Sequence, residues 1–111
     1  MIIMSFNARG WAIPLKNASR LELQKPDIVL IQETMEEGVK ILGELSKLMK
    51  DWDFLSIDSL DRVGGLVIGW RKTSMRLTNF VIFDPRIGVE LISLDLEEAF
   101  YVVNIYGPCE D

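Results

Sequence analysis

The chain has 111 residues, of which 49% are hydrophobic and 26% charged, and its formal net charge is -5. This length and composition are typical of a folded protein with one hydrophobic core, and they exclude a disordered chain. The negative charge argues against long-range attraction to nucleic acid through a basic face, but it permits a phosphate substrate that is held through metal ions.

The first third of the chain predicts a strand, a helix and a second strand. Met1 to Phe6 is short, apolar and compatible with a strand, and polar turn residues follow it. Apolar residues recur near helical spacing from Leu15 to Gln24, and Pro26 bounds this short helix. Asp27 to Ile31 is a continuous apolar run, as expected for a strand that is covered on both faces. This order of elements predicts a parallel crossover unit.

The clearest helical pattern runs from Glu36 to Lys50, where apolar residues share one face and charged residues share the other. After it the sequence predicts five strands, of which the first two form a hairpin and the last three an antiparallel meander. The glycines of the second of these strands indicate a bulge or a close approach of another group to the backbone. The five predicted strands are Trp52 to Ile57, Gly64 to Trp70, Leu77 to Phe83, Val89 to Leu96 and Phe100 to Ile105.

No repeat, low-complexity tract or linker divides the sequence, which therefore predicts a single piece of structure. The apolar runs are far shorter than the ~20 residues that a membrane-spanning helix needs, and the N-terminus lacks a secretory signal pattern. The single cysteine, Cys109, excludes an internal disulfide. We therefore expect an intracellular protein that spans no membrane, with the nucleus as one compatible compartment. Because the chain ends shortly after its last strand, we also expect a truncated domain.

Glu33 is the first candidate for a functional residue, because it follows the predicted buried strand, Asp27 to Ile31, with only Gln32 between them. The C-terminal end of such a strand is a common place for sites in sheets with parallel strands. A carboxylate there suits Mg²⁺, which binds one or two carboxylates and completes its coordination with water and phosphate oxygens. The alternative is an exposed carboxylate at the N-terminus of the next helix, where Thr34 would act as the cap. Taken alone, this segment favours the alternative.

Asn7 and Tyr106 stand at two further strand ends. The Asn7 amide offers a donor and an acceptor to a metal-bound water or a phosphate, although it also suits a turn. The Tyr106 hydroxyl can donate to a phosphate oxygen, but a tyrosine before Gly-Pro equally packs at a strand end. Asn104 would share a face with Tyr106, and burial against backbone partners explains it as well. Arg9 and Arg71 are weaker candidates for phosphate contacts.

Four segments, taken in order, resemble the N-terminal half of the endonuclease/exonuclease/phosphatase superfamily. The similarity is greatest to the endonuclease domain of LINE-type, non-LTR retrotransposon polyproteins, which is related to apurinic/apyrimidinic endonucleases. The resemblance implies an α/β fold: the N-terminal half of a four-layered, DNase I-like α/β sandwich with a mixed sheet and two helices. Residues 1–111 would then be a partial domain whose C-terminal half is absent. The four segments are SFNARG (5–10), PDIVLIQET (26–34), GGLVIGW (64–70) and NIYGP (104–108).

The resemblance also implies a chemistry, since members of this superfamily hydrolyse phosphodiester or phosphomonoester bonds with Mg²⁺ or Mn²⁺. By resemblance Glu33 matches the metal-binding glutamate, and Asn7 matches the asparagine of the first active-site strand. Tyr106 matches the tyrosine that contacts the phosphate. Arg9 replaces a metal-associated aspartate of many apurinic endonucleases, a substitution associated with the retroelement-like branch, and is a candidate phosphate contact. The implied partner is DNA.

Parts of the superfamily's machinery have no counterpart in this sequence. The Gly-Asp-Phe-Asn segment and the terminal Ser-Asp-His segment are missing, and the chain contains no histidine. Loss of several groups that act as a unit removes nearly all catalysis. We therefore expect a truncated metal-dependent phosphodiester hydrolase of the DNA endonuclease type that is inactive as this fragment. Two alternatives stay open: a non-enzymatic remnant or interaction module that self-associates through uncovered sheet edges, and a phosphatase of the same superfamily.

Overall fold

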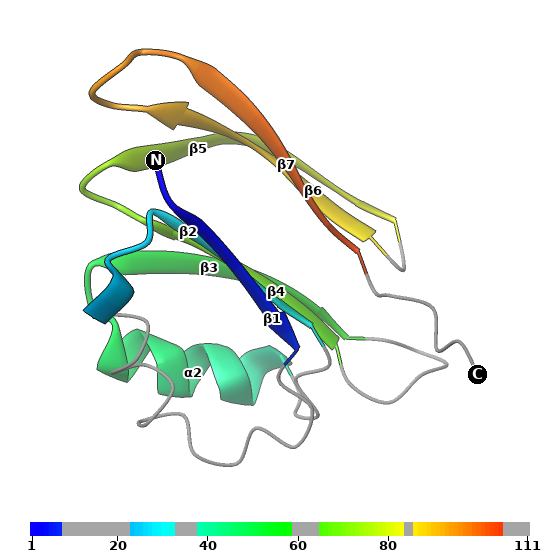
Figure 1. The fold of residues 1–111 in the computed structure, drawn as a ribbon. Helices are drawn as coiled ribbons and strands as arrows, with labels where there is room; N and C mark the ends of the chain where they lie inside the picture. The colour runs from blue at the N-terminus through cyan, green and yellow to red at the C-terminus, as the bar shows by residue number, and fades with distance from the viewer. Residues whose placement is uncertain (8–22, 33–37, 59–64, 84–85, 106–111) are drawn as a thin grey trace.

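Two β-sheets and a covering helix make up the protein in a computed structural model that describes residues 1–7, 23–32, 38–58, 65–83 and 86–105 (Figure 1). The elements are β1 (Ile3–Asn7), β2 (Ile28–Gln32), α2 (Gly38–Leu48), β3 (Trp52–Asp58), β4 (Gly65–Arg71), β5 (Met75–Phe83), β6 (Arg86–Ser93) and β7 (Ala99–Ile105). The first sheet has the strand order β1–β2–β4–β3, and the second has the order β5–β6–β7.

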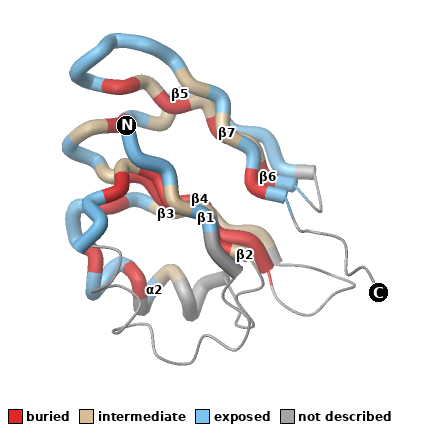
Figure 2. Tube along the Cα trace, viewed as in Figure 1, coloured by how far each residue is buried: buried red, intermediate tan, exposed pale blue. Residues whose placement is uncertain are grey.

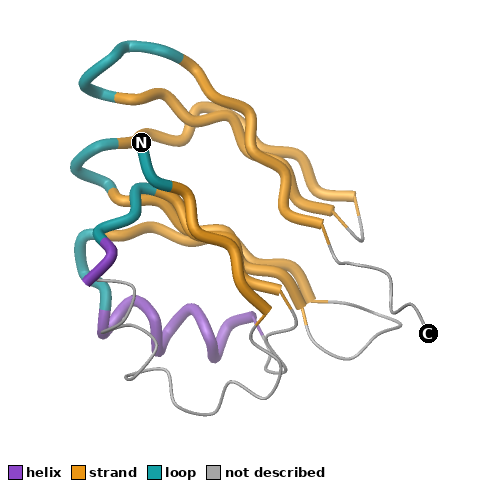
Figure 3. The backbone as a smooth tube through the Cα atoms, viewed as in Figure 1, coloured by secondary structure: helices purple, strands orange, loops and turns teal. Residues whose placement is uncertain are grey.

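The first sheet is the middle layer of three, with α2 on one side and the second sheet on the other (Figures 1 and 3). Its central strands β2 and β4 are therefore covered on both faces, which explains why their sequences are continuous apolar runs. Alternate residues of β2 point to opposite sides, so that Val29 and Ile31 pack in the core under α2 while Ile28 packs between the sheets.

A first hydrophobic core lies between α2 and the first sheet. Leu45 is buried in it, and Leu42 packs against it, as the amphipathic pattern of the helix predicts. Lys47, on the polar side of the same helix, is exposed. In the described parts of the chain, no helix is long and apolar enough to cross a bilayer. The buried members of this core are Val29, Ile31, Leu45, Met49, Trp52 and Val67.

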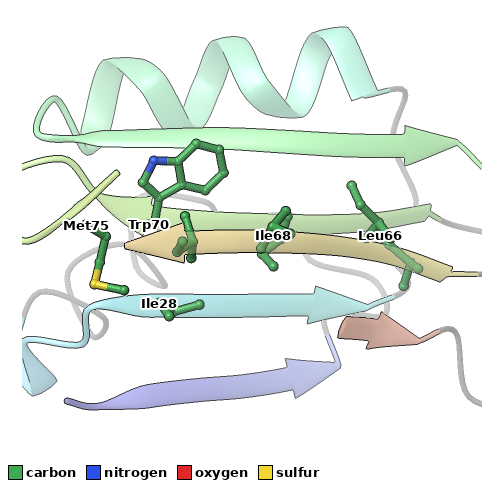
Figure 4. Close-up of a cluster of buried hydrophobic side chains, with 8 residues drawn as sticks. Ile28, Leu66, Ile68, Trp70 and Met75 are labelled. Atoms are coloured by element: carbon green, nitrogen blue, oxygen red, sulfur yellow. The ribbon is translucent and has the colours of Figure 1, made fainter. Parts of the chain in front are cut away.

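A second hydrophobic core fills the space between the two sheets. Figure 4 shows side chains of β2 and β4 that converge with Met75, the first residue of β5. Residues of β6 close this core from the second sheet, because its alternate positions point inward. The buried members are Ile28, Leu66, Ile68, Trp70, Met75, Ile87, Val89 and Leu91.

The strand pairing confirms most of the predicted arrangement. Strands β1 and β2 are parallel, as predicted for the crossover unit, and β3 pairs with β4 in antiparallel orientation. Strands β5, β6 and β7 form the antiparallel meander. Of the helix predicted from Leu15 to Gln24, only Leu23 and Gln24 are described, and both are helical. The prediction of two helices is thus not confirmed, and Leu23 is 82% exposed.

The strand predicted from Val89 to Leu96 begins and ends earlier than expected. Strand β6 runs from Arg86 to Ser93, and the three residues after it form a turn. The Glu97 N–H donates to the carbonyl oxygen of Ser93 at 2.8 Å, and Glu97 adopts a left-handed φ of 56°. Backbone bonds that reverse the chain therefore override the apolar pattern of Leu94 and Leu96, which are exposed.

Gly69 of β4 confirms the predicted close approach to the backbone. A Cβ atom at this position would lie 2.6 Å from two ring carbons of Phe54 and 3.1 Å from Cγ2 of Val29. Phe54 pairs with Gly69 across β3 and β4, and its ring stacks at 6.2 Å on the ring of Trp52. The ring of Phe54 thus occupies the space that any larger residue would need.

Candidate functional site

The candidate site is the edge of the first sheet at which β1 and β2 end. The two strands are parallel, and the last residue of β1, Asn7, pairs with the last residue of β2, Gln32. Glu33 follows Gln32 directly in the sequence. In sheets with parallel strands, ligands commonly bind outside the carboxyl ends of the strands. This edge is therefore the place in the described structure where a site is expected.

The four predicted site residues lie at or beyond the limits of the described residues. Glu33, Arg9 and Tyr106 fall outside them, and for Asn7 the structure describes the backbone but not the side chain. The structure therefore describes the ends of strands β1, β2 and β7, whereas the roles of the four predicted site residues stay predictions. Among the described residues, no group of three or more His, Cys, Asp or Glu side chains is placed to hold a metal ion.

Two amide side chains tie β7 to the first sheet at this edge. Gln32 Nε2 donates to Asn104 Oδ1 at 2.7 Å and to Ser5 Oγ at 3.2 Å. Asn104 Nδ2 donates to the carbonyl oxygens of Ile31 at 3.1 Å and of Val67 at 2.8 Å. Ile31 and Val67 are paired on β2 and β4. One side chain of the second sheet therefore bridges two neighbouring strands of the first.

Asn104 is completely buried, and both its amide nitrogen and its amide oxygen have partners. An unsatisfied polar group in such a place costs about 1–3 kcal/mol, so burial of an asparagine requires these bonds. The interpretation of Asn104 as a buried residue with backbone partners is confirmed. The hydrogen bond between Asn104 and Gln32 was not predicted. A glutamine at the end of an apolar strand could have indicated that a polar partner lies nearby.

Arg71 lies at the opposite end of the first sheet, where β2 begins. Its Nε and Nη2 atoms donate to the carbonyl oxygen of Pro26 at 3.2 and 3.0 Å. Its guanidinium carbon lies 4.9 Å from the ring centroid of Trp52, a distance that allows a cation–π contact. These contacts give Arg71 a structural role in holding the segment that leads into β2.

A second polar group lies on the face of the second sheet that points away from the first. Glu90 accepts a hydrogen bond from Thr78 Oγ1 at 2.7 Å, and it pairs with Tyr101 across β6 and β7. The hydrogen bond from the Tyr101 hydroxyl, aided by that from Thr78, lowers the pKa of Glu90. The same bond and the negative charge of Glu90 raise the pKa of Tyr101. Both shifts arise from a cross-strand pair in contact with solvent.

This outer face of the second sheet also carries a shallow hollow of about 150 Å³. The hollow lies over Gly88, where a Cβ atom would meet Val81 at 3.6 Å and Val103 at 3.7 Å. Glu90 and Tyr101, which already bond to each other, also line it. The hollow is therefore suited to packing and lacks the converging polar groups of an active site.

No protein-family model and no curated protein sequence matches the chain, whereas solved structures match its fold. An endonuclease/exonuclease/phosphatase family protein from Bacteroides thetaiotaomicron aligns with a TM-score of 0.74, over 93% of this chain and 48% of its own, at 14% identity. TDP2 from D. rerio, complexed with a single strand DNA product, has a TM-score of 0.66, covering 91% and 43% at 19% identity. AP endonuclease LMAP from Leishmania major has a TM-score of 0.62, covering 92% and 38% at 16% identity.

These similarities define the class of fold. The described structure corresponds to part of the DNase I-like fold of endonuclease/exonuclease/phosphatase proteins, as the resemblance of the four sequence segments implies. The chain spans about half the length, or less, of the solved structures that it matches.

Proposed function

We propose that residues 1–111 form the N-terminal half of a divalent-metal-dependent phosphodiester hydrolase that acts on DNA. The observation that carries this proposal is the common edge at which the parallel strands β1 and β2 end, within this fold. The amide contact between β2 and β7 brings a third strand end to the same edge. The sequence supplies a carboxylate and two further polar side chains immediately at these ends: Glu33, Asn7 and Tyr106.

In this proposal Glu33 binds Mg²⁺ or Mn²⁺, and Asn7 orients a phosphate oxygen or a water through its amide. Carboxylate and amide oxygens suit a hard cation, whereas a zinc site would need thiolate or imidazole ligands. When bound, the cation neutralises charge on the phosphate and favours ionisation of a bound water. Tyr106 donates its hydroxyl to a phosphate oxygen, and Arg9 adds positive charge beside it.

DNA is the proposed substrate class because of two solved structures that share the fold. The fold is shared with TDP2 bound to a single strand DNA product and with an AP endonuclease. Within the nucleases we favour the LINE-type endonuclease, because the four segments together resemble that branch most and Arg9 is a substitution associated with it. A phosphatase activity is the alternative within the same fold, since phosphatases share it.

We further propose that the 111 residues alone do not turn over DNA. The chain has no histidine, and it has no counterpart of the Gly-Asp-Phe-Asn and Ser-Asp-His segments. Groups that act as a unit in catalysis leave little activity when several are missing. A plasmid-nicking assay in Mg²⁺ should therefore show no cleavage, and turnover that disappears in Glu33→Gln would refute the claim of inactivity.

Isothermal titration calorimetry with Mn²⁺ tests the metal site directly. We expect the wild-type chain to bind Mn²⁺ and Glu33→Gln to bind it at least roughly 100-fold more weakly, because loss of a group that merely supports a ligand already costs about 10–100-fold. Glu36→Gln removes the same charge three residues further along the chain and serves as the control. Equal affinities of the two variants would refute Glu33 as the ligand.

An interaction module is the second candidate function, and a specific surface favours it. The outer face of the second sheet (Val81, Gly88, Tyr101, Val103 and Ile105) has no layer over it among the described residues (Figure 2). Tyr101 is 78% exposed, and the three larger aliphatic side chains are about half exposed. Contiguous apolar patches and open sheet edges favour association with another chain. A chain with only this function would bind no Mn²⁺ through Glu33.

A further inference from the structure

The contact between Gln32 and Asn104 differs from the rest of the interface between the sheets. That interface is filled by apolar side chains of β2, β4, β5 and β6. At the edge where β2 ends, however, a fully buried amide from β7 makes three hydrogen bonds to the first sheet. The interface thus combines non-directional packing over most of its area with directional bonds at one end.

Hydrogen bonds are directional, so they fix the position of β7 against the first sheet, whereas apolar packing alone would allow β7 to shift. Asn104 accepts from Gln32 at 2.7 Å and donates to carbonyl oxygens of two paired strands. A sideways shift of β7 would lengthen all three bonds and leave buried polar atoms without partners, which is costly. An apolar residue at position 104 would fill the same space without setting the position of the strand.

We propose that Gln32 and Asn104 are positioning residues that fix the end of β7 against the end of β2. Glu33 is the next residue after Gln32, and Tyr106 is two residues after Asn104. The relevance to the reaction therefore rests on the proposed function, in which these two residues hold the metal ion and the phosphate. The positioning itself concerns described residues and is testable separately.

The opposite end of β2 offers a matched control. There Ser74 Oγ donates to Asp27 Oδ1 at 2.9 Å, and both side chains are half-buried. Ser74→Ala removes one side-chain hydrogen bond at that end, whereas Gln32→Met removes two at the site edge, those to Asn104 Oδ1 and to Ser5 Oγ. The two variants are compared when their free energies of unfolding fall by similar amounts. If Gln32 only stabilised the fold, both variants would then leave the position of β7 equally unchanged or shift it equally.

Paramagnetic relaxation measures the position of β7 directly. Ile105 is half exposed, so Ile105→Cys in a Cys109→Ser background places a nitroxide at the end of β7. In the full chain we expect strong broadening of the backbone amide signals of Gln32 and of its partner Leu66. Gln32→Met should reduce this broadening, and Ser74→Ala should leave it unchanged. Equal broadening in both variants would overturn the positioning role.

Gln32→Glu keeps the size of the side chain and adds a second readout. Its carboxylate cannot donate to Asn104 Oδ1 at neutral pH, so the broadening should fall as in Gln32→Met. Broadening that stays at the wild-type level in Gln32→Glu would overturn the role of this hydrogen bond.

Mn²⁺ titration of the same variants links the positioning to the proposed site. We expect Gln32→Met to weaken Mn²⁺ binding roughly 10–100-fold, as loss of a supporting contact typically does, and Ser74→Ala to leave it unchanged. Unchanged binding in Gln32→Met would overturn the link to the site. Absence of Glu33-dependent binding in the wild-type chain would instead refute the proposed function, while the relaxation measurement would still decide the positioning role.

Discussion

Asn104 and Glu90 are polar residues of the second sheet that point to opposite faces of it. Asn104 on β7 points to the first sheet, is fully buried and has partners for its amide nitrogen and oxygen. Glu90 on β6 points outward, where Thr78 and Tyr101 bind its carboxylate in contact with solvent. The alternation of side chains along a strand thus decides which polar group needs a complete set of partners.

The Glu90 and Tyr101 pair makes a prediction about pKa. In Tyr101→Phe we expect the pKa of Glu90 to rise, because the carboxylate loses its main hydrogen-bond donor and keeps only the weaker contribution of Thr78. A titration followed by NMR of the Glu90 side chain measures this change, with Thr78→Val as the control that should give a smaller rise. A larger rise in Thr78→Val would contradict the assignment.

The same pair predicts how stability depends on pH. The folded state lowers the pKa of Glu90, so its contribution is present at neutral pH and is lost as the pH falls through the folded value. The folded state raises the pKa of Tyr101, so this contribution is lost as the pH rises through the folded value. The difference in free energy of unfolding between wild type and Tyr101→Phe should therefore narrow at both extremes of pH.

At the scale of elements, two glycines differ in whether the packing around them requires a residue without a side chain. Gly69 lies in β4 where the Phe54 ring fills the space over the backbone, whereas a Cβ atom at Gly43 of α2 would have nothing within 4 Å. Strand β4 therefore needs its glycine to let β3 pack closely. Helix α2 has no such need and loses helix propensity at Gly43.

Substitution of each glycine by alanine should therefore change stability in opposite directions. We expect Gly69→Ala to lower the free energy of unfolding by about 1–3 kcal/mol, as overpacking does. Gly43→Ala should raise it by up to about 1 kcal/mol through helix propensity. Urea denaturation measures both. The double variant Phe54→Leu with Gly69→Ala should lose less than the sum of the single losses, and strict additivity would contradict the proposed clash.

At the scale of the whole molecule, the two sheets are covered unequally. The first sheet lies between α2 and the second sheet, so its central strands are buried on both faces. Among the described residues, no element covers the outer face of the second sheet, and Figure 2 shows β7 largely exposed. This asymmetry is the physical basis of the proposed association with another chain.

We expect the wild-type chain to self-associate as its concentration rises, and Val103→Lys to shift it toward the monomer. A lysine there interrupts the apolar outer face and places a charge on the edge strand β7. Light scattering coupled to size-exclusion chromatography measures the mass. Thr73→Lys adds the same charge at an exposed turn and should not change it. A wild-type monomer at all concentrations would contradict self-association.

The sequence by itself determined which segments are strands, that β2 is covered on both faces, and that α2 has one apolar face. It also placed polar residues at the strand ends and indicated the fold through four ordered segments. These features are local, because residue periodicity and turn chemistry act over a few residues.

Only the tertiary structure decided which residues meet across the sheets. The Gln32 and Asn104 side chains are 72 positions apart and still form one hydrogen bond, and the Phe54 ring fills the space over Gly69. Periodicity states which face a side chain occupies but not which partner it finds there, since partners depend on how the layers pack. The same limit explains why the polar strand ends were predicted, while the amide contact that joins two of them was not.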